Sequence, residues 1–168
     1  MSKGPRPELD PSRCLSMPVD LILVLALSAG IFGLAIWRGG EPEKFGAAII
    51  ALNMCIDLVV LEFVGRWDFS RFSTTRFVID VAEFGLLFCL ALKANRVWPI
   101  FSAAAQLVAV GGSLAVLGSE GGMQIAYWAV TQMPLFGQLL ALFFGTLLHS
   151  RRQAMIGPYR DWRVAHAP

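Results

Sequence analysis

Five long apolar runs fill most of this 168-residue chain and limit the folds that it can adopt. A helix rises about 1.5 Å per residue, so roughly 20 apolar residues cross the ~30 Å hydrocarbon core of a bilayer. A β-structure is excluded, because the runs are too long for strands and do not alternate polar with apolar residues. The runs therefore predict an all-α fold, a polytopic membrane helical bundle with about five transmembrane helices.

The expected helices follow these runs. Ser73, Thr74 and Thr75 offer oxygens that cap a helix N-terminus, so the short third run is extended to begin near residue 74. Pro99 suits a first helical turn, and Pro134 removes a backbone hydrogen bond inside the last helix. The predicted helices are 18–37, 45–64, 74–93, 97–117 and 123–148. They form one bundle over residues 18–150, between a polar N-terminal tail, 1–17, and a basic–aromatic C-terminal tail, 151–168.

The composition indicates that the lipid bilayer is the main partner of the chain. Hydrophobic residues make up 56% and charged residues 15%, whereas about 25% charged residues is usual in soluble domains. The net charge of +2 is too small to predict a nucleic-acid partner, and the basic residues flank the apolar runs. The three cysteines have no paired spacing, so we expect no disulfide framework, no zinc site and no cofactor.

The basic residues also predict an orientation. Eight of them fall on one side of the expected bundle and six on the other, which decides little. The last hairpin is clearer, because its connection, residues 118–122, contains Glu120 and no basic residue, whereas both outer ends are basic. Basic ends stay on the cytoplasmic side, so we expect the C-terminus in the cytoplasm and the N-terminus outside.

Four carboxylates in the second and third runs form the candidate site. These runs are joined by residues 65–76, and we expect them to be antiparallel. A carboxylate in hydrocarbon needs a partner, a cavity or a proton, so one interpretation is a path for protons or cations. Asp57 and Glu83 would be the deeper pair, Glu62 and Asp80 the shallower pair, and Gln106, Gln132 and Gln138 would extend the polar lining.

A structural role for the same carboxylates is the alternative. Glu62 with Arg66, and Arg76 with Asp80, have the i,i+4 spacing of ion pairs on one helix face. The deeper acids would then bond to Asn53 or to a glutamine and stabilise helix packing. A hard cation held by Asp57, Asp80 and Glu83 is a weaker interpretation, because no loop carbonyls accompany these carboxylates.

Other polar and aromatic residues receive structural interpretations. His149 ends the fifth run and is interpreted as a cation at a helix C-terminus. A haem ligand would need a second histidine inside the membrane, and His166 lies in the tail. We expect four tryptophans near run ends to lie at the headgroup level, namely Trp37, Trp67, Trp98 and Trp128.

Small residues at four-residue spacing predict close helix packing, either within the chain or against another subunit. They occur in the first run, at Ala26, Ala29, Gly30 and Gly33, and in the fourth, at Ala105, Ala109 and Ser113. The sequence contains no recognisable catalytic motif, so we expect a protein that is not an enzyme.

Three segments are distinctive, residues 37–49, 91–99 and 150–152, together with Gln106. They include Trp37-Arg38-Gly39-Gly40-Glu41-Pro42, Ala94-Asn95-Arg96-Val97-Trp98-Pro99 and Ser150-Arg151-Arg152. Over most of residues 18–152 the chain resembles a family of small, uncharacterised, multi-spanning bacterial inner-membrane proteins. The resemblance implies a multi-pass protein of the bacterial inner (cytoplasmic) membrane and transfers no site residue.

Two functions remain open from the sequence. The first is a non-enzymatic accessory or assembly subunit of a membrane complex, in contact with another membrane protein or with itself. The second is a small proton- or cation-coupled transporter or channel that uses Asp57, Glu83, Glu62 and Asp80. If the protein is an accessory subunit, its function should not change when Asp57 and Glu83 are neutralised. If it is a transporter or channel, its function should require both carboxylates.

Overall fold

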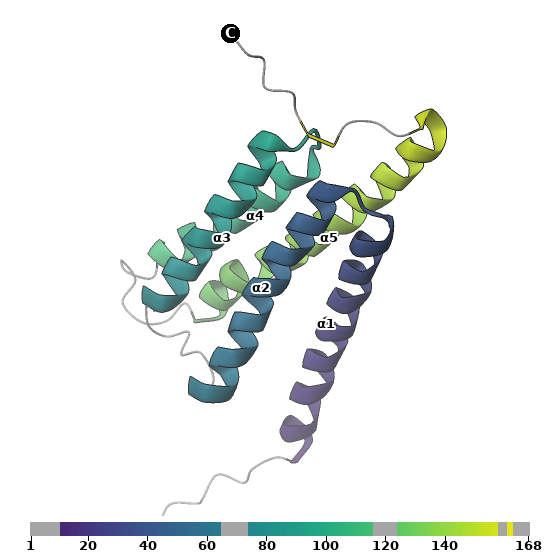
Figure 1. Cartoon of the computed structure of the whole chain (residues 1–168). Helices are drawn as coiled ribbons and strands as arrows, with labels where there is room; N and C mark the ends of the chain where they lie inside the picture. Colours follow the sequence, from purple (N-terminus) through teal and green to yellow (C-terminus); the bar gives the residue numbers. More distant parts are fainter. Residues whose placement is uncertain (1–10, 65–73, 116–123, 158–160, 163–168) are drawn as a thin grey trace, which may run out of the picture. The chain divides into compact units, whose positions relative to one another are not determined.

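The computed structural model describes residues 11–64, 74–115, 124–157 and 161–162 (Figure 1). Within these residues the structure contains five helices and no strand, which confirms the predicted all-α class. The helices are α1 (Pro11–Arg38), α2 (Glu41–Val64), α3 (Thr74–Lys93), α4 (Trp98–Ala115) and α5 (Gln124–Ile156). The chain divides into two compact units, Met1–Gly30 and Ile31–Pro168, and the contacts described below lie within the second unit.

Among the described residues, three helices are long and apolar enough to cross a membrane. The candidate spans are Leu21–Arg38 in α1, Trp98–Ala115 in α4 and Met133–Ile156 in α5. The length and composition of the described helices therefore support three of the five predicted transmembrane helices. In α3 the physical reason is charge, because this helix contains Arg76, Asp80 and Glu83 within one span length.

The last helix is longer than expected, and its end corrects the predicted boundary near residue 148. Residues 150–156 include the good helix formers Arg151, Arg152 and Gln153, so α5 continues to Ile156. It stops at Gly157, which has a φ of 79° and whose N–H donates to the Gln153 carbonyl over 3.0 Å. A glycine in the left-handed conformation is a common helix end.

The helices α2 to α5 run side by side as long rods (Figure 1). The most extensive packing is that of α4 against α5 and α3, and α2 contacts both α3 and α5. In α4, Ala109 and Ser113 are buried, and a Cβ atom on Gly137 of α5 would lie 3.5 Å from that of Ala105. The small residues of the fourth run therefore serve packing within the chain. The apolar core includes Ile31, Ala35, Ala47, Ile50, Leu90, Trp98, Leu139 and Leu142.

The outer surface of the described helices is rich in large apolar side chains. Trp37 is 80% exposed, and Phe101, Leu140 and Leu148 are also exposed. Exposed apolar residues occur on every described helix, including α2 and α3. Extended apolar surfaces are unusual on proteins that face water alone, and they match a hydrocarbon solvent.

Candidate functional site

The first polar site lies between the helices and is built around Arg76. This residue lies in the first turn of α3, and its guanidinium pairs with Asp57 of α2. Its Nε also lies 3.4 Å from Oδ1 of Asp80, one turn further along the same helix. The i,i+4 pair predicted for Arg76 and Asp80 is thus confirmed. One cation serves two carboxylates here, which removes much of the penalty for placing them inside the bundle.

Amides continue this site across the other helices. Asn53 of α2 donates from Nδ2 to Oε2 of Glu83 over 2.6 Å. Gln106 of α4 donates from Nε2 to Oδ1 of Asp80 over 3.2 Å, and Gln138 of α5 donates to Oε1 of Gln106 over 2.8 Å. We call these linked side chains the interhelical polar row, which comprises Asn53, Asp57, Arg76, Asp80, Glu83, Gln106 and Gln138.

The row brings together three of the four predicted carboxylates, but in a different register. The sequence placed Asp57 opposite Glu83, whereas the structure places Asp57 with Arg76 and places Asn53, one turn away, with Glu83. The prediction measured depth from the helix ends and ignored the arginine that fixes the register. The side chains of Glu62 and Gln132 lie outside the described residues.

Three buried oxygens of the row have no hydrogen-bond partner. They are Oδ1 of Asn53, Oδ2 of Asp80 and Oε1 of Glu83. Asp80 is 1% exposed and Glu83 is 3% exposed, so water from the surface does not satisfy them. Buried polar atoms are normally paired, so three unpaired oxygens distinguish this row from the other helix contacts described here. Within the described part of the chain no group of three or more His, Cys, Asp or Glu residues is placed to hold a metal ion.

A second buried polar site, which the sequence did not predict, surrounds Arg96 in the connection between α3 and α4. The Arg96 Nε donates to Oε1 of Glu43 over 3.1 Å, and its terminal nitrogen lies 2.5 Å from Oδ1 of Asp161. The same nitrogen lies 2.7 Å from Nδ1 of His149. We call Glu43, Arg96, His149 and Asp161 the Arg96 cluster. It ties α2, α5 and the C-terminal segment to one guanidinium.

The contact with Arg96 assigns the tautomer of His149. A guanidinium only donates hydrogen bonds, so Nδ1 of His149 accepts and the ring hydrogen is on Nε2. The interpretation of His149 as a cation at a helix C-terminus is wrong, because α5 continues to Ile156 and the side chain is only 6% exposed.

Trp98 completes the second site. Its indole is 6% exposed and donates from Nε1 to Oε1 of Glu43 over 3.1 Å, so the ring packs inside the bundle and does not project from its surface. Space for the ring comes from Gly46 of α2 and Gly145 of α5, where an added Cβ would overlap the indole. Two glycines on facing helices thus hold a large aromatic side chain between them.

Part of the predicted C-terminal tail docks on the bundle. The N–H of Asn95 donates to the Asp161 carbonyl over 2.9 Å, and Trp162 donates from Nε1 to Oε2 of Glu41 over 2.6 Å. The Asp161 carboxylate also accepts from the N–H of Glu41 over 3.3 Å, so it caps α2 from a distance. A sequence signal existed, because the Gly39-Gly40 pair before α2 offers no side chain to cap that helix.

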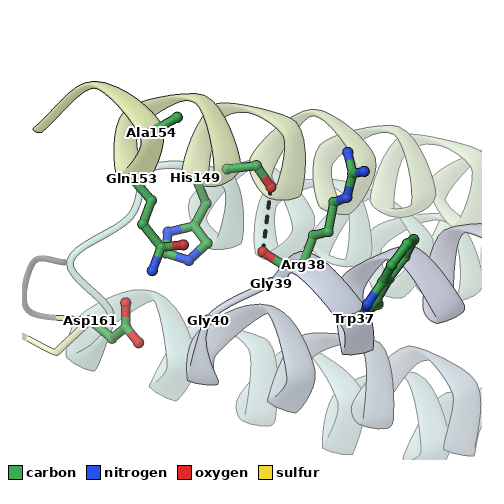
Figure 2. A pocket seen from close by; sticks show the side chains of 9 residues that line it. Trp37, Arg38, Gly39, Gly40, His149, Gln153, Ala154 and Asp161 are labelled. Carbon is green, nitrogen blue, oxygen red and sulfur yellow. Dashed lines mark hydrogen bonds between the residues drawn. The ribbon is translucent and has the colours of Figure 1, made fainter. Parts of the chain in front are cut away.

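An open pocket lies beside the Arg96 cluster, with a volume of about 740 Å³. Figure 2 shows Asp161 at one end of this pocket and Arg38 toward the other, with Gln153 and His149 between them. The Ser150 hydroxyl, on the α5 side, lies 3.4 Å from the Arg38 carbonyl oxygen. The complete lining is Trp37, Arg38, Gly39, Gly40, His149, Ser150, Gln153, Ala154 and Asp161.

Comparison of the chain with models of known protein families, with curated proteins and with solved structures finds no match. The resemblance to small bacterial inner-membrane proteins therefore remains a prediction. The structural findings themselves describe an all-helical chain, within the part that is described, with three helices able to cross a membrane and two buried polar sites.

Proposed function

We propose that the protein is an integral, multi-pass protein of the bacterial cytoplasmic membrane and acts as a non-enzymatic accessory or assembly subunit. The observation that carries this proposal is the pairing of Arg76 with both Asp57 and Asp80 inside the bundle. Because these charges face one another, α2 and α3 can present apolar surface to lipid in spite of their composition. We therefore propose that all five helices cross or enter the bilayer.

Glycines that are exposed or partly exposed support a role in assembly. A Cβ added at Gly33 of α1, Gly85 of α3 or Gly111 of α4 would meet no atom of the chain within 4 Å. A helical glycine costs about 1 kcal/mol relative to alanine, and packing within this chain does not require it at these positions. In membranes, small residues on an outer face allow another helix to approach closely. Contact with a second membrane helix would use these positions.

Retention of a partner in mild detergent tests this role. Gly33→Leu and Gly111→Leu add bulk where the chain itself has room, so both should fold and both should lose the partner. Ala48→Leu, at another exposed position on α2, is the matched control and should retain it. Retention of the same partner by all three variants would count against assembly through these faces.

Proton or cation transport is the second candidate function. It is favoured by the unpaired Oδ1 of Asn53 and Oε1 of Glu83, which belong to two side chains already joined by one hydrogen bond. A single proton on Oε1 of Glu83 would let it donate to Oδ1 of Asn53 and satisfy both atoms. A proton held in this way, next to the ion pairs of Arg76, is a feature of relays inside membranes.

Proton flux in liposomes separates the two candidates. The measurement compares wild-type protein with the Asp57→Asn/Glu83→Gln double variant, after circular dichroism has shown that both are folded. Glu41→Gln, a neutralised carboxylate outside the row, is the control. Absence of flux in all three supports the structural role, whereas flux that is lost only in the double variant makes transport the function.

A further inference from the structure

In the proposed membrane location, the pocket beside the Arg96 cluster lies where lipid headgroups meet the protein. The apolar span of α1 ends at Arg38, which lines the pocket, and the neighbouring Trp37 is 80% exposed. Exposed tryptophan and arginine at a span end are typical of the headgroup level. The volume of about 740 Å³ is within the range of small-molecule sites.

The two ends of the pocket carry opposite charge. Arg38 is exposed at one end, and its guanidinium lies over the Trp37 ring, 5.1 Å from the ring centroid. Asp161 is at the other end, with its side chain 24% exposed (Figure 2). A ligand that matches both ends must carry an anionic group and a cationic group.

The charges behind the pocket favour a cationic group of the ligand at the Asp161 end. The Arg96 cluster contains two carboxylates, Glu43 and Asp161, and one guanidinium, while His149 accepts at Nδ1 and adds no positive charge. Oε2 of Glu43 is buried without a hydrogen-bond partner. Among these four described side chains the carboxylates outnumber the guanidinium by one, and a cation at the open side, which is the side of Asp161, would balance them.

The middle of the pocket provides neutral hydrogen-bonding groups. Gln153 lies on the same helix as His149 and lines the pocket (Figure 2), and its amide both donates and accepts. Ser150 also lines the pocket, and its hydroxyl already donates to the Thr146 carbonyl over 3.0 Å. The N–H groups of the Gln153 amide suit the ester oxygens of a phosphodiester better than an acyl chain, which needs an apolar lining.

We propose that this pocket binds a phosphate group that carries a primary ammonium group, as in phosphoethanolamine, with the phosphate at Arg38 and the ammonium at Asp161. The same chemistry occurs in an aminophospholipid headgroup and in a soluble aminoalkyl phosphate. A primary ammonium donates three hydrogen bonds to carboxylates, and a guanidinium donates in parallel to phosphate oxygens. The inference rests on the proposed membrane location but not on the accessory role.

Lipid binding to the full chain in detergent tests the proposal. Short-chain phosphatidylethanolamine, phosphatidylcholine and phosphatidylglycerol are titrated separately, and bound lipid is counted by native mass spectrometry. We expect phosphatidylcholine to bind about tenfold more weakly than phosphatidylethanolamine, because its quaternary ammonium cannot donate a hydrogen bond to Asp161. Equal affinities for the two lipids, or tighter binding of phosphatidylglycerol, would overturn the proposal.

Two variants locate the binding. Arg38 is exposed, so we expect the Arg38→Gln variant to fold. The variant should bind all three lipids about tenfold more weakly, because the contact with the phosphate is lost. Arg151→Gln, an exposed arginine of α5 that does not line the pocket, is the matched control and should bind like wild type. If both substitutions weaken lipid binding equally, the lipids are attracted to basic residues in general, and the proposal of a binding site at Arg38 is overturned.

Asp161→Asn keeps a side-chain oxygen for the cap of α2, and it should remove the preference for phosphatidylethanolamine over phosphatidylcholine. A folded variant that keeps the preference excludes Asp161 as the ammonium site. If Asp161→Asn does not fold, Arg38→Gln still decides the outcome.

A soluble competitor, glycerophosphoethanolamine, separates the two sources of the ligand. Displacement of the lipid at similar concentrations identifies a soluble phosphoamine site, and failure to displace it identifies a headgroup site. The lipid-binding results are independent of the flux and partner measurements. Failure of the proposed binding site would therefore not contradict the proposed function, and failure of the accessory role would not contradict the binding site.

Discussion

Arg96 and Glu43 lie 53 residues apart in sequence and are joined by a hydrogen bond of 3.1 Å between two buried side chains. Glu43 is 0% exposed, in the first turn of α2, and Arg96 lies in the connection that leads to α4. Neither charge is stable at such a position without the other. The pair therefore fixes the start of α2 against the start of α4.

Removal of the arginine should destabilise the bundle strongly. In Arg96→Met the Glu43 carboxylate keeps its burial and loses its cation, for which we expect a loss of about 3–5 kcal/mol in the free energy of unfolding. The measurement is denaturant unfolding in detergent micelles, followed by circular dichroism. Lys93→Met, at an exposed site three residues earlier, should change the stability by less than about 0.5 kcal/mol. The double variant Arg96→Met/Glu43→Gln should recover part of the loss, and no recovery would contradict the account.

Gly46→Ala tests the packing of Trp98 between two helices. The added methyl group would overlap the indole, so we expect a loss of about 1–3 kcal/mol and a change in tryptophan fluorescence. Gly111→Ala, on an exposed face of α4, should instead gain about 0.5–1 kcal/mol from helix propensity. If both substitutions change the free energy of unfolding in the same direction, the close approach of Trp98 to Gly46 is not present in the folded protein.

The ion pairs of Arg76 should be strongly coupled. Arg76→Gln should destabilise the protein because it removes the cation that pairs with Asp57 and Asp80, and Asp57→Asn because it removes one of the two carboxylates that balance Arg76. The double variant should be more stable than the sum of the two losses predicts, with a coupling energy of about 0.5–3 kcal/mol. The measurement is a double-mutant cycle of unfolding free energies. Strict additivity would show that Arg76 and Asp57 do not depend on each other.

The described contacts of the C-terminal segment belong to Asp161 and Trp162. Truncation after Gly157 removes the cap of α2 and one partner of Arg96, so we expect a loss of about 1–3 kcal/mol in stability. Truncation after Trp162 keeps both residues and is the matched control. Comparable melting temperatures for the two truncated chains would refute a stabilising role for these contacts.

The orientation can be measured with reporter fusions. We expect a green fluorescent protein fused after Ile156 to be fluorescent, because basic residues flank that end and should stay in the cytoplasm. Alkaline phosphatase fused after Ala115 should be active, because the following connection contains no basic residue and should lie outside. A non-fluorescent fusion after Ile156 together with an inactive phosphatase after Ala115 would reverse the orientation.

The helical class could be predicted from local patterns alone. Long apolar runs, the capping residues before Thr74 and the proline after Trp98 are local signals, and the structure contains helices at all of these places. The i,i+4 pair of Arg76 and Asp80 was also predictable, because helix geometry places these residues on one face. Local geometry therefore determined the helices and the contacts within each of them.

Contacts between helices were decided by the tertiary structure. The sequence could not show that Asp57 pairs with Arg76, because register depends on which charges find a partner when two helices pack. His149, Trp98 and Asp161 looked like surface residues, since each lies at the end of an apolar run or in a polar tail.

Packing brings these three residues to Glu43 and Arg96, far away along the chain. Burial of a charge is possible only where a distant partner compensates for lost water, so long-range geometry decides it. The sequence by itself determined an apolar, helical chain suited to a bilayer, and only the tertiary structure decided which polar groups meet inside it.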